Sequence, residues 1–278
     1  MELTGSDAWR GWDRETLSAA YNNNAAVPSG SAIVAGWAAA SAALRAQRPT
    51  GLDQPYGPAP RQRWDLFPAA APDAPCLVFI HGGYWQRNSR EGFSCIVEGA
   101  LAMGWSAALP SHTLAPEENM TTIAAEMRQA LDWLQQEGPS QGLAGPVLLA
   151  GWSAGGHLAA LMSGHALVTA ALAISGIFDL APIRGTGLND ALNLTDAEIA
   201  AFSPQALPPV PKPVAVAYGA AELPELRRQS LSFHAHRAAA GAPGPLLAVE
   251  GADHFSILES LRRPGGALLG AATALLPG

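Results

Sequence analysis

Two serines of the chain stand in the pattern GxSxG, in which a serine hydroxyl can act as a nucleophile toward a carbonyl group. One match, GPSQG at 138–142, lies in a polar turn after a helical pattern and has no strand before it. The other, GWSAG at 151–155, follows an apolar run at 147–150 and begins a helical pattern. Because a strand, a sharp turn and a helix together expose such a serine, Ser153 is the candidate nucleophile, and Ser140 is predicted to lie in a loop. The alternative interpretation of Ser153 is an ordinary serine in a glycine-rich turn.

A glycine pair upstream of the candidate nucleophile could bind the negative charge that forms on a carbonyl oxygen during attack. The sequence HGGYW at 81–85 directly follows an apolar run, and glycines let the backbone approach a substrate closely. We predict that the amides of Gly82, Gly83 and Ala154 form an oxyanion hole. The helix that begins at Ala154 directs its positive end toward the same charge. The alternative is a plain Gly-Gly turn.

One histidine is well placed to activate the serine as a general base. His254 lies in a loop just after the last predicted strand, 246–249, where an imidazole can reach the nucleophile. The other histidines come too early in the chain or lie within predicted structural segments. A surface histidine is the alternative. Asp253 adjoins His254, but neighbouring side chains in an extended loop diverge, so Asp253 is not expected to orient the imidazole.

The carboxylate that orients this histidine is expected after the strand at 214–218, because the order serine, acid, histidine requires it there. The next carboxylates along the chain are Glu222 and Glu225. Glu222 is nearer the end of the strand, whereas Glu225 falls in the first turn of the next helix, where a carboxylate also favours the helix dipole. We therefore favour Glu222 and keep Glu225 as the alternative.

Four aromatic residues neighbour these candidate catalytic groups in the sequence: Tyr84, Trp85, Trp152 and Phe255. Their clustering predicts a substrate-binding pocket that holds a planar or apolar group. Ordinary packing in the core is the alternative for each of them taken alone.

Short apolar runs alternate with amphipathic segments, which predicts an α/β fold with a mostly parallel central sheet and helices on both faces. Strands are predicted at 63–67, 76–80, 106–109, 147–151, 168–175, 214–218 and 246–249, and helices at 121–136, 154–165 and 224–240. Residues 1–60 combine helical patterns with a connector rich in proline and glycine, and they are expected to pack on the core, 61–278, within one structural domain. The long connection at 176–211, with a helical pattern at 195–202, is expected to be a lid or a pocket wall.

The composition excludes several classes of function. The net charge is −7 and Lys212 is the single lysine, so nucleic acid is not an expected partner. Cys76 and Cys95 have no spacing suited to zinc, and no metal or organic cofactor is expected. The N-terminus does not resemble a signal peptide, and no apolar run is long enough to span a membrane. We therefore expect a cytoplasmic protein that acts on a small-molecule substrate, with a homodimer left open.

The chain resembles the kynurenine formamidase (arylformamidase) branch of the α/β-hydrolases over about residues 15 to 260. The resemblance lies in YNN at 21–23, HGGYW at 81–85, the GxSxG turn, SGIFDL at 175–180 and ELRRQS at 225–230. It implies an α/β-hydrolase fold, a triad of Ser153, His254 and Glu222, and hydrolysis of N-formylkynurenine to kynurenine and formate. The chain has glutamate where eukaryotic members usually have aspartate in the triad, and Trp152 where histidine is usual.

Two other functions remain open from the sequence. A carboxylesterase, or an amidase for other short acyl groups, would use the same triad with a roomier acyl pocket. A non-catalytic receptor for small molecules could share the fold, but such receptors usually lack a member of the triad.

Overall fold

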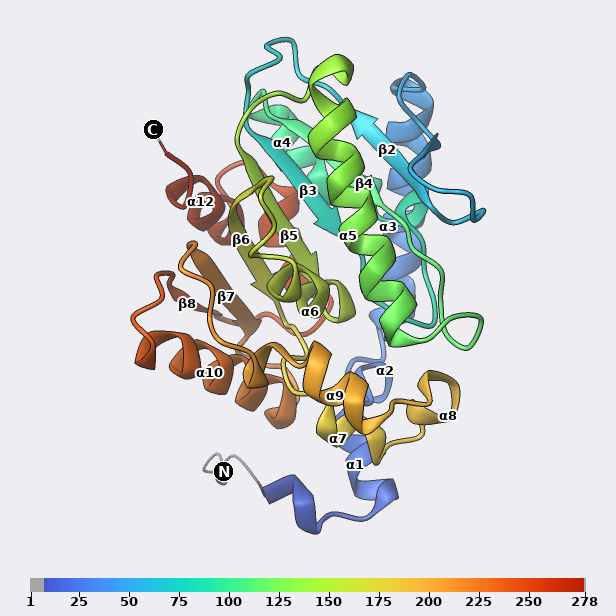
Figure 1. Cartoon of the computed structure of the whole chain (residues 1–278), viewed down its shortest axis with the longest axis vertical. Helices are drawn as coiled ribbons and strands as arrows, with labels where there is room; N and C mark the ends of the chain where they lie inside the picture. Colours follow the sequence, from blue (N-terminus) through green and yellow to red (C-terminus); the bar gives the residue numbers. More distant parts are fainter. Residues whose placement is uncertain (1–7, 278) are drawn as a thin grey trace.

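A mixed sheet of eight strands forms the centre of the molecule, and the computed structural model describes residues 8–277. The strands are β1 (Gln54–Pro55), β2 (Arg63–Phe67), β3 (Cys76–Ile80), β4 (Ser106–Pro110), β5 (Val147–Trp152), β6 (Val168–Ile174), β7 (Val214–Gly219) and β8 (Leu246–Val249). Their order is β1-β2-β4-β3-β5-β6-β7-β8 (Figure 1). Strand β2 pairs antiparallel with β1 and β4, and all other pairs are parallel. Residues 1–7 lie outside the described residues. They are the start of the predicted N-terminal segment and of the stretch compared with signal peptides.

Side chains of the central strands alternate between two hydrophobic cores, one on each face of the sheet. In β3, Leu77 and Phe79 belong to one core, and Val78 and Ile80 belong to the other. A strand that is buried on both faces has a continuous apolar sequence, as the CLVFI of β3 does.

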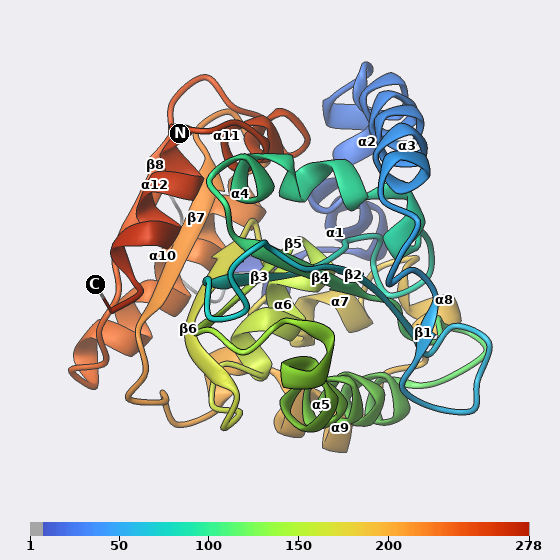
Figure 2. The same cartoon turned by 90° about the horizontal axis from the view of Figure 1, so that it is seen from above.

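Helices cover both faces, as Figure 2 shows. The face with Leu77 packs against α3 (Gly30–Gln47), α4 (Glu98–Ala102), α11 (Glu259–Arg262) and α12 (Ala267–Ala274). The face with Val78 packs against α5 (Met120–Glu137), α6 (Ala154–Leu161) and α10 (Pro224–Ala239). The predicted α/β class, with a mostly parallel sheet between two helical layers, is confirmed.

The strand predictions agree with the structure to within one residue at each end, but two other predictions differ from it. The helix predicted at 154–165 ends at Leu161, because Ser163 and Gly164 are poor helix formers and the Ser163 hydroxyl donates to the Ala160 carbonyl. Residues 176–211 hold more helix than the one predicted segment: α7 (Ala181–Arg184), α8 (Asn189–Leu192), α9 (Asp196–Phe202) and the 3-10 turn η5 (Pro204–Ala206).

The N-terminal helices α1 (Arg14–Ala20) and α2 (Asn23–Ala26) lie beside α7 and α8, at the end of the sheet where β3 and β5 finish (Figure 1). The Ser18 hydroxyl accepts a hydrogen bond from the Gly187 amide at 3.0 Å. Arg14 of α1 also forms an ion pair with Asp190 of α8 at 2.5 Å. Two segments that are distant in sequence are thereby brought together over the ends of the central strands.

The other 3-10 turns are η1 (Ala8–Gly11), η2 (Arg90–Gly92), η3 (Ser94–Val97), η4 (Gly138–Gln141) and η6 (Ser256–Leu258). Ser140 is exposed in η4 and donates to the Glu137 carbonyl, which confirms that the first GxSxG match is a surface turn. Both cysteines are free and buried. Among residues 8–277, no helix is long and apolar enough to cross a membrane.

Candidate active site

Ser153 stands at a sharp turn between β5 and α6. Its φ of +58° and ψ of −119° lie in a region that non-glycine residues rarely adopt. The turn needs glycines on both sides: a Cβ on Gly151 would collide with the Gly155 carbonyl, and a Cβ on Gly155 would collide with the Ile80 carbonyl. The Ser153 amide donates to the Ile174 carbonyl at 2.8 Å, which fixes the turn to the next strand. The second GxSxG is therefore a strand-turn-helix elbow.

The glycine pair after β3 lies against this elbow. A Cβ on Gly82 would be 3.0 Å from the Ser153 Cβ, closer than atoms of this kind normally approach. The Gly82 carbonyl accepts from the Asn88 side-chain amide at 3.0 Å. Because the carbonyl and the following N–H of one peptide point in opposite directions, this bond also fixes the direction of the Gly83 amide. Among the described residues, the amides of Gly83 and Ala154 have no acceptor in the protein.

A buried histidine also holds the glycine loop. The His81 Nδ1–H donates to the Gly82 carbonyl at 2.9 Å, and its ring stacks on His112 with 5.4 Å between centroids. Burial lowers the pKa of His81 to about 3, and the neighbouring His112 adds to the effect. Burial likewise lowers the pKa of His112 to about 4. His81 therefore stays neutral near pH 7 and keeps a single ring hydrogen, which its bond to Gly82 uses.

His254 and Glu222 meet beside the elbow. The His254 Nδ1 lies 3.7 Å from Glu222 Oε1, and both side chains are almost completely buried. This separation is longer than a hydrogen bond, as is common for catalytic pairs without substrate. Glu222 Oε1 also accepts from the Gly219 amide at 3.1 Å and from the Ser175 hydroxyl. Since Nδ1 faces Glu222, Nε2 is the nitrogen of His254 that is left for another partner.

Glu225, the alternative acid, is occupied elsewhere. Its Oε2 accepts from Arg228 Nε at 2.8 Å, and its Oε1 accepts from the Tyr21 hydroxyl at 3.0 Å. Gln229 donates to the same hydroxyl at 2.7 Å. These bonds join α10 to the N-terminal segment. The geometry therefore favours Glu222 as the partner of His254.

Trp152 connects the elbow to the histidine loop. Its indole N–H donates to the His254 carbonyl at 2.7 Å, and the two ring centroids are 4.9 Å apart. The Phe255 ring lies 5.8 Å from that of Trp152, and both residues line the same cavity. Trp85 does not line it. With 1% of its surface exposed, Trp85 packs edge-on against His157 in the core, so the predicted role of this tryptophan in substrate binding has no geometric support.

Tyr84 lines the cavity and is bound to the N-terminal segment. Its hydroxyl donates to the Tyr21 carbonyl at 2.5 Å and accepts from the Asn23 side chain at 3.1 Å. Its φ of +53° shows that the loop after the glycine pair is tightly turned. The N-terminal segment therefore positions an aromatic side chain that the sequence predicted to contact substrate.

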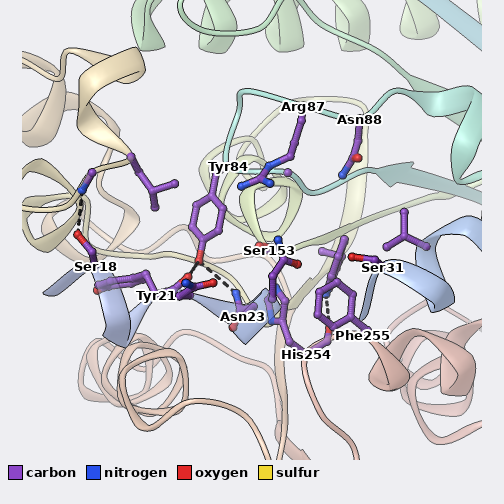
Figure 3. Close-up of a pocket in the computed structure, with 17 residues that line it drawn as sticks. Ser18, Tyr21, Asn23, Ser31, Tyr84, Arg87, Asn88, Ser153, His254 and Phe255 are labelled. Carbon is purple, nitrogen blue, oxygen red and sulfur yellow. Dashed lines mark hydrogen bonds between the residues drawn. The ribbon is translucent and has the colours of Figure 1, made fainter. Parts of the chain in front are cut away.

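A cavity of about 500 Å³ brings most of these residues together (Figure 3). Five segments line it: Ser18, Tyr21, Asn22, Asn23, Asn24, Ser31 and Val34; Gly83, Tyr84, Arg87 and Asn88; Trp152 and Ser153; Gly187 and Leu188; His254 and Phe255. Figure 3 shows Ser153 beside His254, with Tyr84 bonded to the N-terminal residues Tyr21 and Asn23 on one side and Phe255 and Ser31 on the other. The N-terminal lining and Arg87 were not predicted from the sequence, although YNN at 21–23 was among the motifs that carried the resemblance.

Comparisons with known proteins identify the family and the fold of the chain. The BD-FAE family model matches residues 66–179. A Salmo salar protein named kynurenine formamidase is 30% identical over 230 residues, which cover 76% of this chain and 77% of that protein. A Danio rerio protein of the same name is 29% identical over 229 residues, with the same coverage. Among solved structures, a Silicibacter protein named as a candidate thioesterase has a TM-score of 0.82 at 29% identity, covering 92% of this chain and 98% of that one. The chain therefore belongs to the kynurenine formamidase family and is a hydrolase with the α/β-hydrolase fold.

Proposed function

We propose that the protein hydrolyses aryl formamides of the N-formylkynurenine type, with Ser153 as nucleophile, His254 as general base and Glu222 as the carboxylate that orients it. One observation carries the proposal. Ser153 stands in a strained elbow on the same cavity as His254, and the unpaired amides of Gly83 and Ala154 are contributed by the loop and the helix that adjoin it. This is the arrangement that acyl transfer through a serine requires.

The first half of the reaction forms an acyl-enzyme. Ser153 Oγ attacks the formyl carbon while His254 Nε2 takes the hydroxyl proton, and Glu222 stabilises the resulting imidazolium. The amides of Gly83 and Ala154, with that of Gly82, bind the carbonyl oxygen as it becomes negative; in other enzymes one such donor lowers the barrier by roughly 3 kcal/mol. The C–N bond then breaks, and His254 returns the proton to the leaving aryl amine.

The second half releases formate. Water attacks the formyl-serine ester while His254 takes one of its protons, and the oxyanion is bound by the same amides. Collapse of this intermediate breaks the bond to Ser153 Oγ, which recovers its proton from His254. The products are the amine and formic acid, which releases its proton to water as formate, and the enzyme returns to its initial protonation state.

The wall of the cavity supports an aromatic leaving group. Tyr84, Trp152 and Phe255 line the cavity, and aromatic pockets favour planar apolar groups. The formyl group, the smallest acyl group, is inferred from the relatives named kynurenine formamidase. An esterase for short acyl groups would use the same residues, so the test must compare the two substrate classes.

The decisive comparison is kcat/KM for N-formylkynurenine against kcat/KM for short aryl esters such as phenyl acetate. We expect the formamide to be hydrolysed within about tenfold of the ester, with one formate released for each amine, because the protonated His254 can assist an amine leaving group. A formamide slower by several decades, beside efficient ester hydrolysis, would replace the proposal by a carboxylesterase.

A further inference from the structure

We infer that Arg87 selects substrates that carry a carboxylate on the leaving-group side, and this inference rests on the proposed function. Arg87 lines the cavity, and in Figure 3 its side chain points from its loop toward Ser153, between Tyr84 and Asn88. A guanidinium binds a carboxylate through two parallel hydrogen bonds, which gives both affinity and orientation.

The guanidinium of Arg87 is free to bind a ligand. Among the described residues, no carboxylate or carbonyl of the protein pairs with it. The guanidinium of Arg14, which lies near Gly187 of the cavity lining, is already paired with Asp190 at 2.5 Å. Arg87 is thus the arginine at this cavity that is left for a substrate.

The loop that carries Arg87 is fixed on both sides. The Gln86 side chain donates to the Leu188 carbonyl at 3.0 Å, and the Asn88 side chain donates to the Gly82 carbonyl at 3.0 Å. Arg61 also donates to the Asn88 carbonyl, at 2.5 Å. The backbone on either side of Arg87 is therefore anchored, which limits the region that its exposed side chain can reach around the cavity.

The charge of the cavity favours an anion. Among the described residues that line it, Arg87 is the one with a permanent charge, and none is an aspartate or a glutamate. The chain as a whole has a net charge of −7, so an anionic substrate is repelled overall and gains most from a local cation. The other polar groups of the lining include the neutral side-chain amides of Asn22, Asn23, Asn24 and Asn88.

The test compares substrates that differ in one charge. 4-Formamidobenzoate and 4-formamidobenzamide have nearly the same shape, and so do the corresponding 3-isomers. The quantity measured is the ratio of kcat/KM for the acid to kcat/KM for the amide. The substitution Arg87→Gln should lower this ratio by about tenfold for at least one isomer, because a hydrogen bond to a charged group contributes about this much. Arg87→Lys should keep part of the preference, since it keeps the charge but not the paired geometry.

Arg48→Gln is the matched control. Arg48 is exposed and lies outside the cavity lining, and its replacement removes the same charge from the whole protein as Arg87→Gln does. It should leave the ratio unchanged. The preference for the acid should also weaken as salt is raised. An equal effect of Arg87→Gln on acid and amide, or no effect on either, would overturn the inference.

The same ratio measured with 4-acetoxybenzoate and 4-acetoxybenzamide separates this inference from the proposed function. If the formamides are not hydrolysed but the ester ratio falls in Arg87→Gln, the formamidase proposal fails and the role of Arg87 stands. If both formamides are hydrolysed with an unchanged ratio, the role of Arg87 fails and the proposed function stands.

Discussion

At the scale of single residues, the position of Glu222 depends on a serine to which sequence reasoning gave no role. The Ser175 hydroxyl donates to Glu222 Oε1, the same oxygen that faces His254 Nδ1 at 3.7 Å. The φ of Ser175 is +50°, and its amide donates to the Ala217 carbonyl at 2.7 Å, so its backbone is held at the end of β6. Ser175 is therefore expected to position the carboxylate rather than to contact substrate.

Removing the Ser175 hydroxyl should lower kcat while KM for the aryl formamide stays nearly constant. Both Ser175→Ala and Ser175→Gly should reduce kcat by about tenfold, the effect of one hydrogen bond to a charged group. The glycine variant is the control, because it accepts a positive φ without strain but also lacks the hydroxyl. Full activity in Ser175→Gly with loss in Ser175→Ala would mean that the backbone conformation, and not the hydroxyl, matters.

At the scale of elements, the sequence predicts the central strands well because each is a short, mostly apolar run that ends at a polar or glycine-containing turn. β3 reads CLVFI and β5 reads VLLAGW, and the candidate nucleophile follows directly from the end of β5. The elbow at Ser153, the glycine loop at 82–83 and the loop with His254 each follow a strand. Their meeting at one end of the sheet could therefore be predicted from the order of elements alone.

The elements that were missed have weak local signals. α7 and α8 are four residues long, too short for a helical period to show. α12, ALLGAATA, is apolar all round and has no polar face that would reveal it. β1 has two residues, one of them a proline.

The N-terminal lining of the cavity could not be predicted for a different reason. Tyr21 and Asn23 reach Glu225 and Tyr84 through contacts that span large separations in sequence. Such contacts depend on how α1 and α2 pack over the sheet, which hydrophobic periodicity does not encode. Arg87 was missed likewise, because a single arginine in a loop has no sequence pattern. Its place in the cavity depends on which residues surround it in the folded chain.

At the scale of the whole molecule, buried neutral histidines couple stability to pH. Burial lowers the pKa of His81 to about 3, and the pKa values of His112 and His157 to about 4 each. Below the ordinary histidine pKa of 6.5 the unfolded chain takes up protons at these positions, whereas the folded protein does not until the pH approaches 4. The unfolded state therefore binds more protons in this window, and acid favours unfolding.

We accordingly expect the free energy of unfolding to fall as the pH is lowered from about 6.5 to 4, and to be nearly independent of these groups above 7. Three histidines together give a slope of at most about 4 kcal/mol per pH unit. Urea unfolding at pH 7, 6 and 5 measures this dependence of the free energy of unfolding on pH. In His157→Gln, the glutamine amide can still donate to the Phe202 carbonyl that His157 Nε2 contacts. Because one of the three titrating histidines is removed, the slope should fall by roughly a third. A urea midpoint that does not change between pH 7 and 5 would contradict this account.

The central claim, that Ser153 is the nucleophile, is tested most directly by the mass and site of the adduct formed with a serine-directed fluorophosphonate. The chain supplies its own control in Ser140, the serine of the other GxSxG, which is exposed in η4. We predict one adduct per chain, on Ser153, in the unaltered protein and in Ser140→Ala, and none in Ser153→Ala, which should also lose hydrolysis of formamide and ester. An adduct on another residue, or Ser153→Ala protein that is still labelled and active, would contradict the assignment.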